Sequence, residues 1–168
     1  HGSVKDSRII NSIFHILPNN KNKSSSSNYL NYFSYKDRKN KYITWTSSNG
    51  NIFTLINFWA SWHSGSMAIR DSLFKIPANL KNENYRVLNI SLDYDKNAWL
   101  KACKEDSKQV CDYKGWNTQV VKQNKIYQLP ANILVDQSRK VMGTNLYGEE
   151  LHQKVLQLIK EDKEKKNN

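Results

Sequence analysis

The stretch from residue 52 to residue 66 constrains the fold of this chain more than any other part. An apolar, strand-like run, Ile52-Phe53-Thr54-Leu55-Ile56, leads into Asn57-Phe58-Trp59-Ala60-Ser61-Trp62-His63-Ser64-Gly65-Ser66, and helix-like sequence follows. Consecutive apolar, β-branched and aromatic residues are typical of a strand. The stretch therefore predicts a strand that passes through a turn into the N-terminus of a helix.

The other segments with regular patterns alternate between strand and helix. Further strands are predicted at residues 41–45, 85–92, 132–135 and 140–146, and helices at residues 64–82, 95–105, 116–125 and 149–160. Asn49-Gly50 is a tight-turn signal between the strands at 41–45 and 52–58, and Pro77 is expected to kink or divide the longest helix. This alternation predicts an α/β fold whose central sheet is covered by helices on both faces.

The chain has 168 residues, enough for one domain with a sizeable core. Residues 1–28 are predicted to be an N-terminal extension, in which a short helix, Val4–Leu17, ends at Pro18 and an Asn/Lys/Ser-rich linker follows. Residues 29–162 are predicted to form the domain, and residues 163–168 a charged tail. His1-Gly2-Ser3 looks like a cloning remnant, so a native leader is expected to have been removed.

Charge and hydropathy argue against nucleic-acid binding and against a membrane-spanning segment. The formal net charge is +11, but the lysines are scattered along the chain, and the densest run, Lys160–Lys166, contains acidic residues as well. Nucleic-acid binding is not expected, because no stripe of arginines alternates with aromatic residues. A transmembrane segment is not expected, because no apolar run approaches the length of about 20 residues that spans a bilayer.

The segment Phe58-Trp59-Ala60-Ser61-Trp62, with the four residues that follow it, resembles the active-site segment of the thioredoxin superfamily. In that superfamily Phe-Trp-Ala-x-Trp precedes Cys-x-x-Cys. From about Tyr29 to Lys160 the chain is similar to the TlpA/ResA-type branch of thiol–disulfide oxidoreductases. Further segments that carry this resemblance are Asn89-Ile90-Ser91-Leu92-Asp93, Gly115-Trp116-Asn117, Tyr127-Gln128-Leu129-Pro130 and Asn132-Ile133-Leu134-Val135-Asp136.

The resemblance implies a thioredoxin-like α/β fold, in which a central mixed sheet is flanked by helices. It also implies an N-terminal strand extension and an inserted helix that begins near Gly115. Pro130 is implied to follow a cis peptide bond and to face the segment His63–Ser66. Finally, the resemblance implies a location in the bacterial periplasm or cell envelope, because this branch is typically exported.

His63 and Ser66 occupy the two positions at which the family has its cysteines. Disulfide exchange needs a thiolate that attacks and a second thiol that resolves the mixed disulfide, and neither side chain supplies one. Asn57 stands where many thioredoxins have a buried aspartate, although the TlpA-like branch often has asparagine there. Ile69 stands where ResA-like proteins commonly have an acidic residue. We therefore hypothesise a member of the thiol–disulfide oxidoreductase family that is redox-inactive at the usual site.

His63 and Ser66 are three residues apart at a predicted helix start, so they should lie near each other. A nucleophilic Ser–His pair would also need an oxyanion hole and an orienting carboxylate, and the sequence signals neither. Capping of the helix by His63 or Ser64 is the favoured interpretation. The histidines show no spacing typical of metal ligands, so no metal site and no cofactor are expected.

Cys103 and Cys111 are separated by seven residues, so they are not a Cys-x-x-Cys pair. The first is predicted on the helix at residues 95–105, and the second just beyond it. Three interpretations stay open: a structural disulfide, which is favoured, two separate buried thiols, and a relocated redox pair.

The former active site could still bind an extended peptide or protein segment through backbone hydrogen bonds at the proline turn. The expected groove residues are Trp62, His63, Ser64, Gly65, Ser66, Leu129 and Pro130. Two alternatives to a redox-inactive binding domain remain. One is an active oxidoreductase that uses Cys103 and Cys111, and the other is a structural module of an envelope protein.

Overall fold

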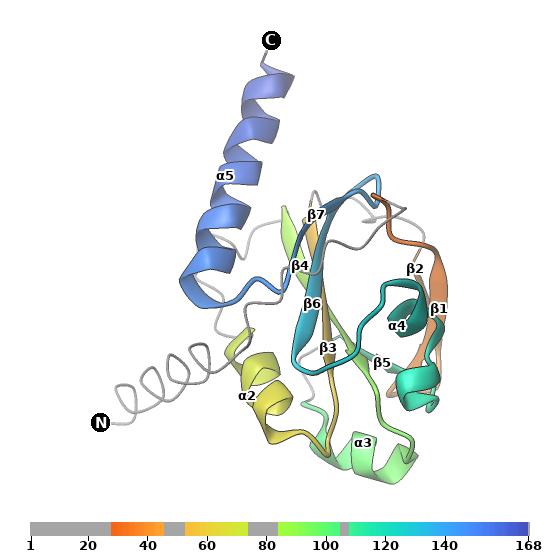
Figure 1. Ribbon diagram of the computed structural model, residues 1–168. Helices are drawn as coiled ribbons and strands as arrows, with labels where there is room; N and C mark the ends of the chain where they lie inside the picture. The colour runs from red at the N-terminus through yellow and green to blue at the C-terminus, as the bar shows by residue number, and fades with distance from the viewer. Residues whose placement is uncertain (1–27, 46–52, 74–83, 105–107, 168) are drawn as a thin grey trace, which may run out of the picture.

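Figure 1 shows the computed structural model, which describes residues 28–45, 53–73, 84–104 and 108–167. The predicted helix Val4–Leu17, the linker up to residue 27, the Asn49-Gly50 turn and Pro77 lie outside these ranges. The described chain forms one mixed sheet with helices against both of its faces (Figure 1). The predicted α/β class and the mixed, helix-flanked sheet are confirmed.

The sheet has seven strands in the order β2-β1-β5-β4-β3-β6-β7. They are β1 (Phe33–Asp37), β2 (Tyr42–Trp45), β3 (Phe53–Trp59), β4 (Tyr85–Ser91), β5 (Gln109–Cys111), β6 (Ala131–Asp136) and β7 (Val141–Thr144). β4 runs parallel to β3 and β5, and the other neighbouring pairs are antiparallel. β3 lies inside the sheet, and each of its residues is buried.

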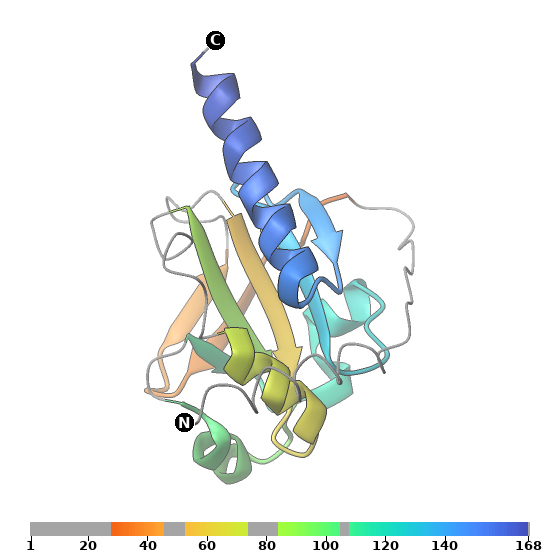
Figure 2. The ribbon, with the colours of Figure 1, turned by 90° about the vertical axis from the view of Figure 1, so that its left-hand side faces the viewer.

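Helices pack against both faces of this sheet. The helices of the described ranges are α2 (Ser64–Leu73), α3 (Lys96–Ala102), the 3-10 helix η2 (Gly115–Asn117), α4 (Gln119–Gln123) and α5 (Gly148–Lys166). α2 and α5 lie on one face and α4 on the other (Figure 1 and Figure 2). Because side chains alternate along a strand, β3 contributes to both cores. Phe53 and Leu55 share a buried cluster with residues of α2 and α5, whereas Ile56 and Phe58 share one with residues of α4.

Two strands of the sheet, β1 and β5, are absent from the sequence-based prediction. β1 buries Phe33 and Tyr35 and exposes Ser34, an alternation too short to stand out, and β5 has only three residues. β1 lies between β2 and β5, so β2 is the edge strand and is not a neighbour of β3. The tight turn predicted between β2 and β3 therefore does not join a pair of adjacent strands.

Helix boundaries also depart from the prediction. α2 is described as far as Leu73, and residues 74–83 lie outside the described ranges. The helix predicted at residues 116–125 is two short helices, η2 and α4, with Thr118 between them. α5 continues to Lys166, so most of the segment predicted as a charged tail is helical. Among the helices of the described ranges, none is long and apolar enough to cross a membrane.

Candidate functional site

The candidate site lies where β3 ends, at Trp59, and α2 begins, at Ser64. β6 runs antiparallel to β3 and starts beside the end of that strand. Leu129 and Pro130 directly precede β6, so they lie at the same end of the sheet as the turn before α2 (Figure 1). The Leu129–Pro130 peptide bond is cis, as the resemblance implied.

His63 caps the N-terminus of α2. Its imidazole Nδ1 accepts a hydrogen bond from the backbone N–H of Ser66 at 2.9 Å, and its carbonyl oxygen accepts one from the N–H of Met67 at 3.1 Å. The first N–H groups of a helix have no partner within the helix, so this contact satisfies a donor that would otherwise lack one. The predicted capping role is confirmed. Because Nδ1 is an acceptor, the proton of the neutral ring is on Nε2.

Ser66 is completely buried, with 0% of its surface exposed. Its hydroxyl accepts a hydrogen bond from the N–H of Ala60 at 3.1 Å and donates one to the carbonyl oxygen of His63 at 2.9 Å. The imidazole nitrogen of His63 that faces this residue is bonded to the backbone N–H of Ser66, not to its hydroxyl. The arrangement is therefore a structural cap, and it lacks the serine–histidine hydrogen bond that activates a nucleophile.

A buried carboxylate not expected from the sequence holds the turn before α2. Asp93 is 1% exposed and accepts hydrogen bonds from the backbone N–H and hydroxyl of Ser61 and from the hydroxyl of Ser91. Its position directly after an apolar strand was the only sequence signal for this role. Asp93 belongs to no metal-binding group, since the described ranges contain no suitable cluster of three or more His, Cys, Asp or Glu side chains.

An amide pair lies in the sheet where many thioredoxins have an acid. The Nδ2 of Asn57 donates to the Oδ1 of Asn89 at 2.9 Å, across the parallel pair β3 and β4. Both side chains are buried, at 0% and 2% exposure, and the Oδ1 of Asn57 has no hydrogen-bond partner within the described part of the chain. Ile69, the other position at which the resemblance implied an acid, is 1% exposed in the apolar core. Neither position carries a group that titrates near neutral pH.

Aromatic side chains form the exposed rim of the site. Trp62 is 50% exposed, and its ring centroid lies 6.1 Å from that of Trp116. The N–H of Trp116 donates to the hydroxyl of Tyr94, whose ring packs against Gly115. A Cβ at Gly115 would lie 2.0 Å from the Tyr94 ring, and its φ of +55° suits glycine. Tyr127, in the turn before the cis-proline, is 74% exposed.

The predicted groove residues divide into an exposed and a buried set. Trp62 and Ser64 are exposed, and His63 and Gly65 are partly exposed. Ser66, Leu129 and Pro130 are buried. The exposed part of the predicted groove is therefore the turn before α2.

Both cysteines are free thiols, so the favoured disulfide is not formed in this structure. Cys103 follows α3 and is partly buried, whereas Cys111 ends β5 and is 1% exposed. Both pack in one cluster with Trp59 and Trp99. Burial raises the pKa of Cys103 to about 12 and that of Cys111 to about 11. These are the properties of two buried thiols, the second of the three interpretations.

Arg70, on α2, is a buried cation that the sequence pattern did not single out. It is 2% exposed, donates to the carbonyl oxygen of Ala102 at 2.8 Å, and pairs with Asp71 at 2.7 Å. The same ion-pair network reaches Lys104, which lies 2.9 Å from Asp71. Arg70 thereby joins the helix that starts at the site to the end of α3.

Solved structures share this fold. The chain is 38% identical to the C-terminal domain of a protein assigned as a thiol–disulfide oxidoreductase of Bacteroides thetaiotaomicron, over 79% of this chain and 95% of that one, with a TM-score of 0.69. It is 33% identical to a thiol–disulfide oxidoreductase of Bacteroides fragilis, over 77% of this chain and 98% of that one, with a TM-score of 0.70. A protein assigned as the thiol:disulfide interchange protein DsbE of Chlorobium tepidum has the same fold at 19% identity, over 76% and 93% of the chains, with a TM-score of 0.66. No model of a protein family and no curated protein matches the chain.

Two observations assign the family. Identity of 38% and 33% extends over almost the whole length of two bacterial domains. The order of the elements along the chain also matches the thioredoxin fold. The strand–turn–helix at residues 53–73 comes first, and the cis-proline turn before β6 follows it. The chain belongs to the thioredoxin-like thiol–disulfide oxidoreductases of the TlpA/ResA type, and His63 and Ser66 stand at the positions of both active-site cysteines.

Proposed function

We propose that this domain has lost thiol–disulfide exchange at the usual site and serves to bind an extended peptide or protein segment there. The observation that carries the proposal is the closed hydrogen-bond network of His63 and Ser66. The imidazole of His63 caps α2, and the hydroxyl of Ser66 is bonded to two backbone groups. Both replacements hold the helix start in place, and neither supplies the sulfur that exchange requires.

The surroundings support the loss of redox chemistry. Ile69 has an alkyl group where ResA-like proteins commonly have an acid, and Asn57, which is bonded to Asn89, has the amide that the TlpA-like branch often has. Amide and alkyl groups do not take up or release protons near neutral pH. General acid–base assistance to a thiol is therefore missing at these positions, as well as the thiol itself.

The alternative of an oxidoreductase that uses Cys103 and Cys111 is disfavoured by the state of the thiols. The pKa of about 12 for Cys103 and of about 11 for Cys111 leaves the reactive thiolate in about one molecule in ten thousand or fewer at pH 7. Cys111 is also 1% exposed. A partner disulfide could contact this sulfur only after local unfolding had exposed it.

Two features support peptide binding. Among the described residues, Leu129 makes no backbone hydrogen bond, and we propose that its main chain pairs with an added extended segment. Trp62, Trp116 and Tyr127 supply aromatic surface at the same end of the sheet. Aromatic side chains offer a large contact area with few rotatable bonds, which suits an interface.

The location that we propose is the periplasm or cell envelope of a bacterium. The similar proteins are bacterial thiol–disulfide oxidoreductases, and this branch is typically exported. A structural module of an envelope protein is the remaining alternative. It differs from a binding domain because it would have no requirement for Trp62 or for the exposed turn.

The test uses the full chain in an insulin-reduction assay with dithiothreitol and in a selection of phage-displayed nine-residue peptides. We expect no acceleration of insulin reduction and enrichment of peptides that bind. Trp62→Ala should weaken the binding of an enriched peptide by about tenfold or more. Tyr42→Ala, which removes a 67% exposed aromatic from the distant edge strand β2, is the matched control and should have little effect.

Three results would change this proposal. Insulin reduction by the wild type that disappears in Cys103→Ser would favour the oxidoreductase that uses Cys103 and Cys111. No enrichment of any peptide would favour the structural module. Equal loss of binding in Trp62→Ala and Tyr42→Ala would show that the selected peptides bind elsewhere.

A further inference from the structure

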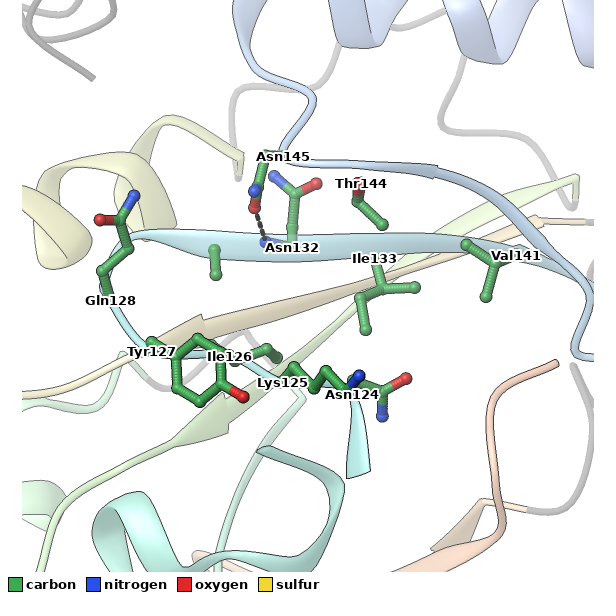
Figure 3. A pocket seen from close by; sticks show the side chains of 11 residues that line it. Asn124, Lys125, Ile126, Tyr127, Gln128, Asn132, Ile133, Val141, Thr144 and Asn145 are labelled. Carbon is green, nitrogen blue, oxygen red and sulfur yellow. Dashed lines mark hydrogen bonds between the residues drawn. The ribbon is translucent and has the colours of Figure 1, made fainter. Parts of the chain in front are cut away.

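A pocket lies beside the hairpin that β1 and β2 form, away from the proposed peptide groove. We call it the hairpin pocket. Its volume is about 260 Å³, and it lies between the turn of the hairpin and the start of β5. A different pocket, lined by Tyr127 and Gln128, lies beside the cis-proline turn (Figure 3). The strands of the two pockets are at opposite ends of the strand order, so the hairpin pocket is a separate candidate site.

Strand pairing brings three basic residues to the hairpin pocket. Asp37, the last residue of β1, pairs with Val110 of β5. Arg38 and Lys39 directly follow Asp37, and Lys108 lies just before β5. All three line the pocket. Because like charges repel one another, an anion between these side chains would be stabilised.

The acidic residue of the lining, Asp37, is already bonded to the backbone of the turn. Its Oδ1 accepts hydrogen bonds from the N–H of Lys39 at 2.8 Å and from the N–H of Lys41 at 2.9 Å. Within the described part of the chain, no ion pair joins Arg38, Lys39 or Lys108 to a carboxylate. The described lining therefore has three cations and one acid, which leaves an excess of positive charge.

The guanidinium of Arg38 gives the most specific indication of a ligand. Its Nε is buried and has no hydrogen-bond partner among the described residues. Burial raises the pKa of Cys103, and the charge of Arg38 opposes this rise, so the guanidinium lies close to that thiol. Buried donors in folded proteins are almost always bonded. A buried donor without a partner in a basic pocket indicates that a ligand supplies the acceptor.

These features fit a small dianion with several acceptor oxygens. A guanidinium presents paired N–H groups to two oxygens of one anion, and lysine ammonium groups add point charges. A phosphate group carries up to two negative charges near neutral pH, whereas a single carboxylate carries one. The volume of about 260 Å³ is below the roughly 300 Å³ at which pockets for drug-sized molecules begin. Ile43 and Val110 add an apolar wall, which suits a short carbon chain attached to the anion.

We propose that the hairpin pocket binds a phosphate group, either of inorganic phosphate or of a small phosphate monoester. Arg38 binds two of its oxygens, and Lys39 and Lys108 pair with its charge. The proposal does not depend on the peptide binding proposed above, because the two sites share no residue. Loss of one site would leave the other in place.

The experiment titrates the nitrogen-15-labelled full chain and follows its backbone amide signals by NMR. The ligands are inorganic phosphate, glycerol 3-phosphate and acetate, each at about pH 7.5 and at constant ionic strength. The protein variants are Arg38→Met and Lys108→Gln. The matched control is Lys41→Gln, which removes the charge of an exposed residue in the same turn that does not line the pocket.

We expect the amide signals of Arg38, Lys39 and Lys108 to shift and to saturate with at least one of the two phosphates, with a Kd of about 1 mM or lower. Arg38→Met should weaken binding by about tenfold or more, and Lys108→Gln by about threefold or more. Lys41→Gln should change it by less than about twofold. Tighter binding of glycerol 3-phosphate would identify a monoester as the ligand, and tighter binding of inorganic phosphate the free ion.

Thermal melting separates binding from folding. Without phosphate, Arg38→Met should melt at the temperature of the wild type or above it, because it removes an unpaired buried donor and keeps an unbranched apolar side chain. Phosphate at about ten times Kd should raise the melting temperature of the wild type by about 3 °C or more, and that of Arg38→Met by less than half as much. General salt effects of phosphate act on both proteins alike.

Four results would overturn the proposal. The first is an absence of shifts at these three amides with either phosphate up to about 20 mM, twenty times the expected Kd. The second is acetate binding as tight as that of phosphate, which would show a site for any anion. The third is equal weakening by Arg38→Met and Lys41→Gln, which would reduce the effect to net charge. The fourth is an Arg38→Met variant that melts well below the wild type without phosphate, because Arg38 would then have its partner within the fold.

Discussion

The guanidinium of Arg70 lies over the indole of Trp59, with its Cζ 3.9 Å from the ring centroid. Trp59 is the last residue of β3, and the turn of the candidate site begins after it. The same guanidinium is bonded to the carbonyl oxygen of Ala102, the last residue of α3. One buried cation thus joins β3, α2 and α3 next to the turn of the candidate site.

Arg70→Met should lower the free energy of unfolding by about 2–4 kcal/mol, because it removes a buried cation from the Ala102 carbonyl and from Asp71. Arg70→Lys should also destabilise, by about 1–2 kcal/mol, since an ammonium group lacks the planar face and the fork of donors. Urea denaturation measures both. The control is Lys104→Ala, which removes the exposed partner of Asp71 and should cost about 0.5 kcal/mol or less. An Arg70→Met variant as stable as this control would contradict the assigned role.

The cap at His63 leads to a second prediction. His63→Ala should lower the free energy of unfolding by about 1 kcal/mol, because the N–H of Ser66 loses its acceptor. His63→Asn should retain most of the wild-type stability, since asparagine is a favoured N-cap residue. Urea denaturation of the two variants side by side gives the comparison. If both lose the same stability, the imidazole contributes through packing and not through the cap.

Patterns within one element were readable from the sequence, and contacts between distant elements were not. The run at residues 52–58 predicts β3 because all of its residues are buried, as an interior strand requires. β5 could not be predicted because its three residues are too few to show the alternation of a strand. The position of β2 at the edge depends on β1, which pairs with β5 through Lys36 and Asp37. No local turn signal contains that information.

The candidate site shows the same division. Capping by His63 could be predicted because its partner, Ser66, is three residues away. Three other features join groups 32 residues apart in sequence: the contact of Ser61 with Asp93, that of Asn57 with Asn89, and that of Arg70 with Ala102. Spacing alone also leaves the state of a cysteine pair undetermined, because it does not define where either side chain points.

The buried thiol of Cys111 should make the protein less stable in alkali. Burial raises its pKa from 9.0 to about 11, so the unfolded chain releases this proton at a lower pH than the folded chain does. The contribution to stability is fully present below pH 9 and is lost as the pH rises towards about 11, on the order of 2 kcal/mol in all. Urea denaturation between pH 8 and pH 11, compared with Cys111→Ala, measures it.

The variant should show a shallower decline of stability across this range. Its stability should still fall, because burial raises the pKa of Cys103 from 9.0 and that of Tyr35 from 10.0 to about 12, so both groups act over part of the same range. Thermal melting of the wild type with and without dithiothreitol is the control for oxidation of the thiols. Both thiols are free, so we expect the melting temperature to be independent of the reductant. Parallel pH profiles for wild type and variant would argue against a buried, protonated Cys111.

His63→Cys combined with Ser66→Cys should create thiol–disulfide exchange at a site that has no cysteine. The first cysteine would lie at the start of α2, where the helix dipole and the free N–H groups lower the pKa of a thiol. The second would lie in the buried position of Ser66, three residues on, and could resolve the mixed disulfide. Loss of the histidine cap and of the serine hydrogen bonds should lower stability by about 1–3 kcal/mol.

The restored activity should be slow, because Asn57 and Ile69 supply no proton acceptor near the new sulfurs. Insulin reduction by wild type, by the double variant and by His63→Cys alone, at equal concentration, measures it. The single variant is the matched control: it has the nucleophile without the resolving thiol, so it should trap mixed disulfides and not turn over. A double variant that melts cooperatively and still shows no activity would mean that the site has diverged beyond its two missing sulfurs.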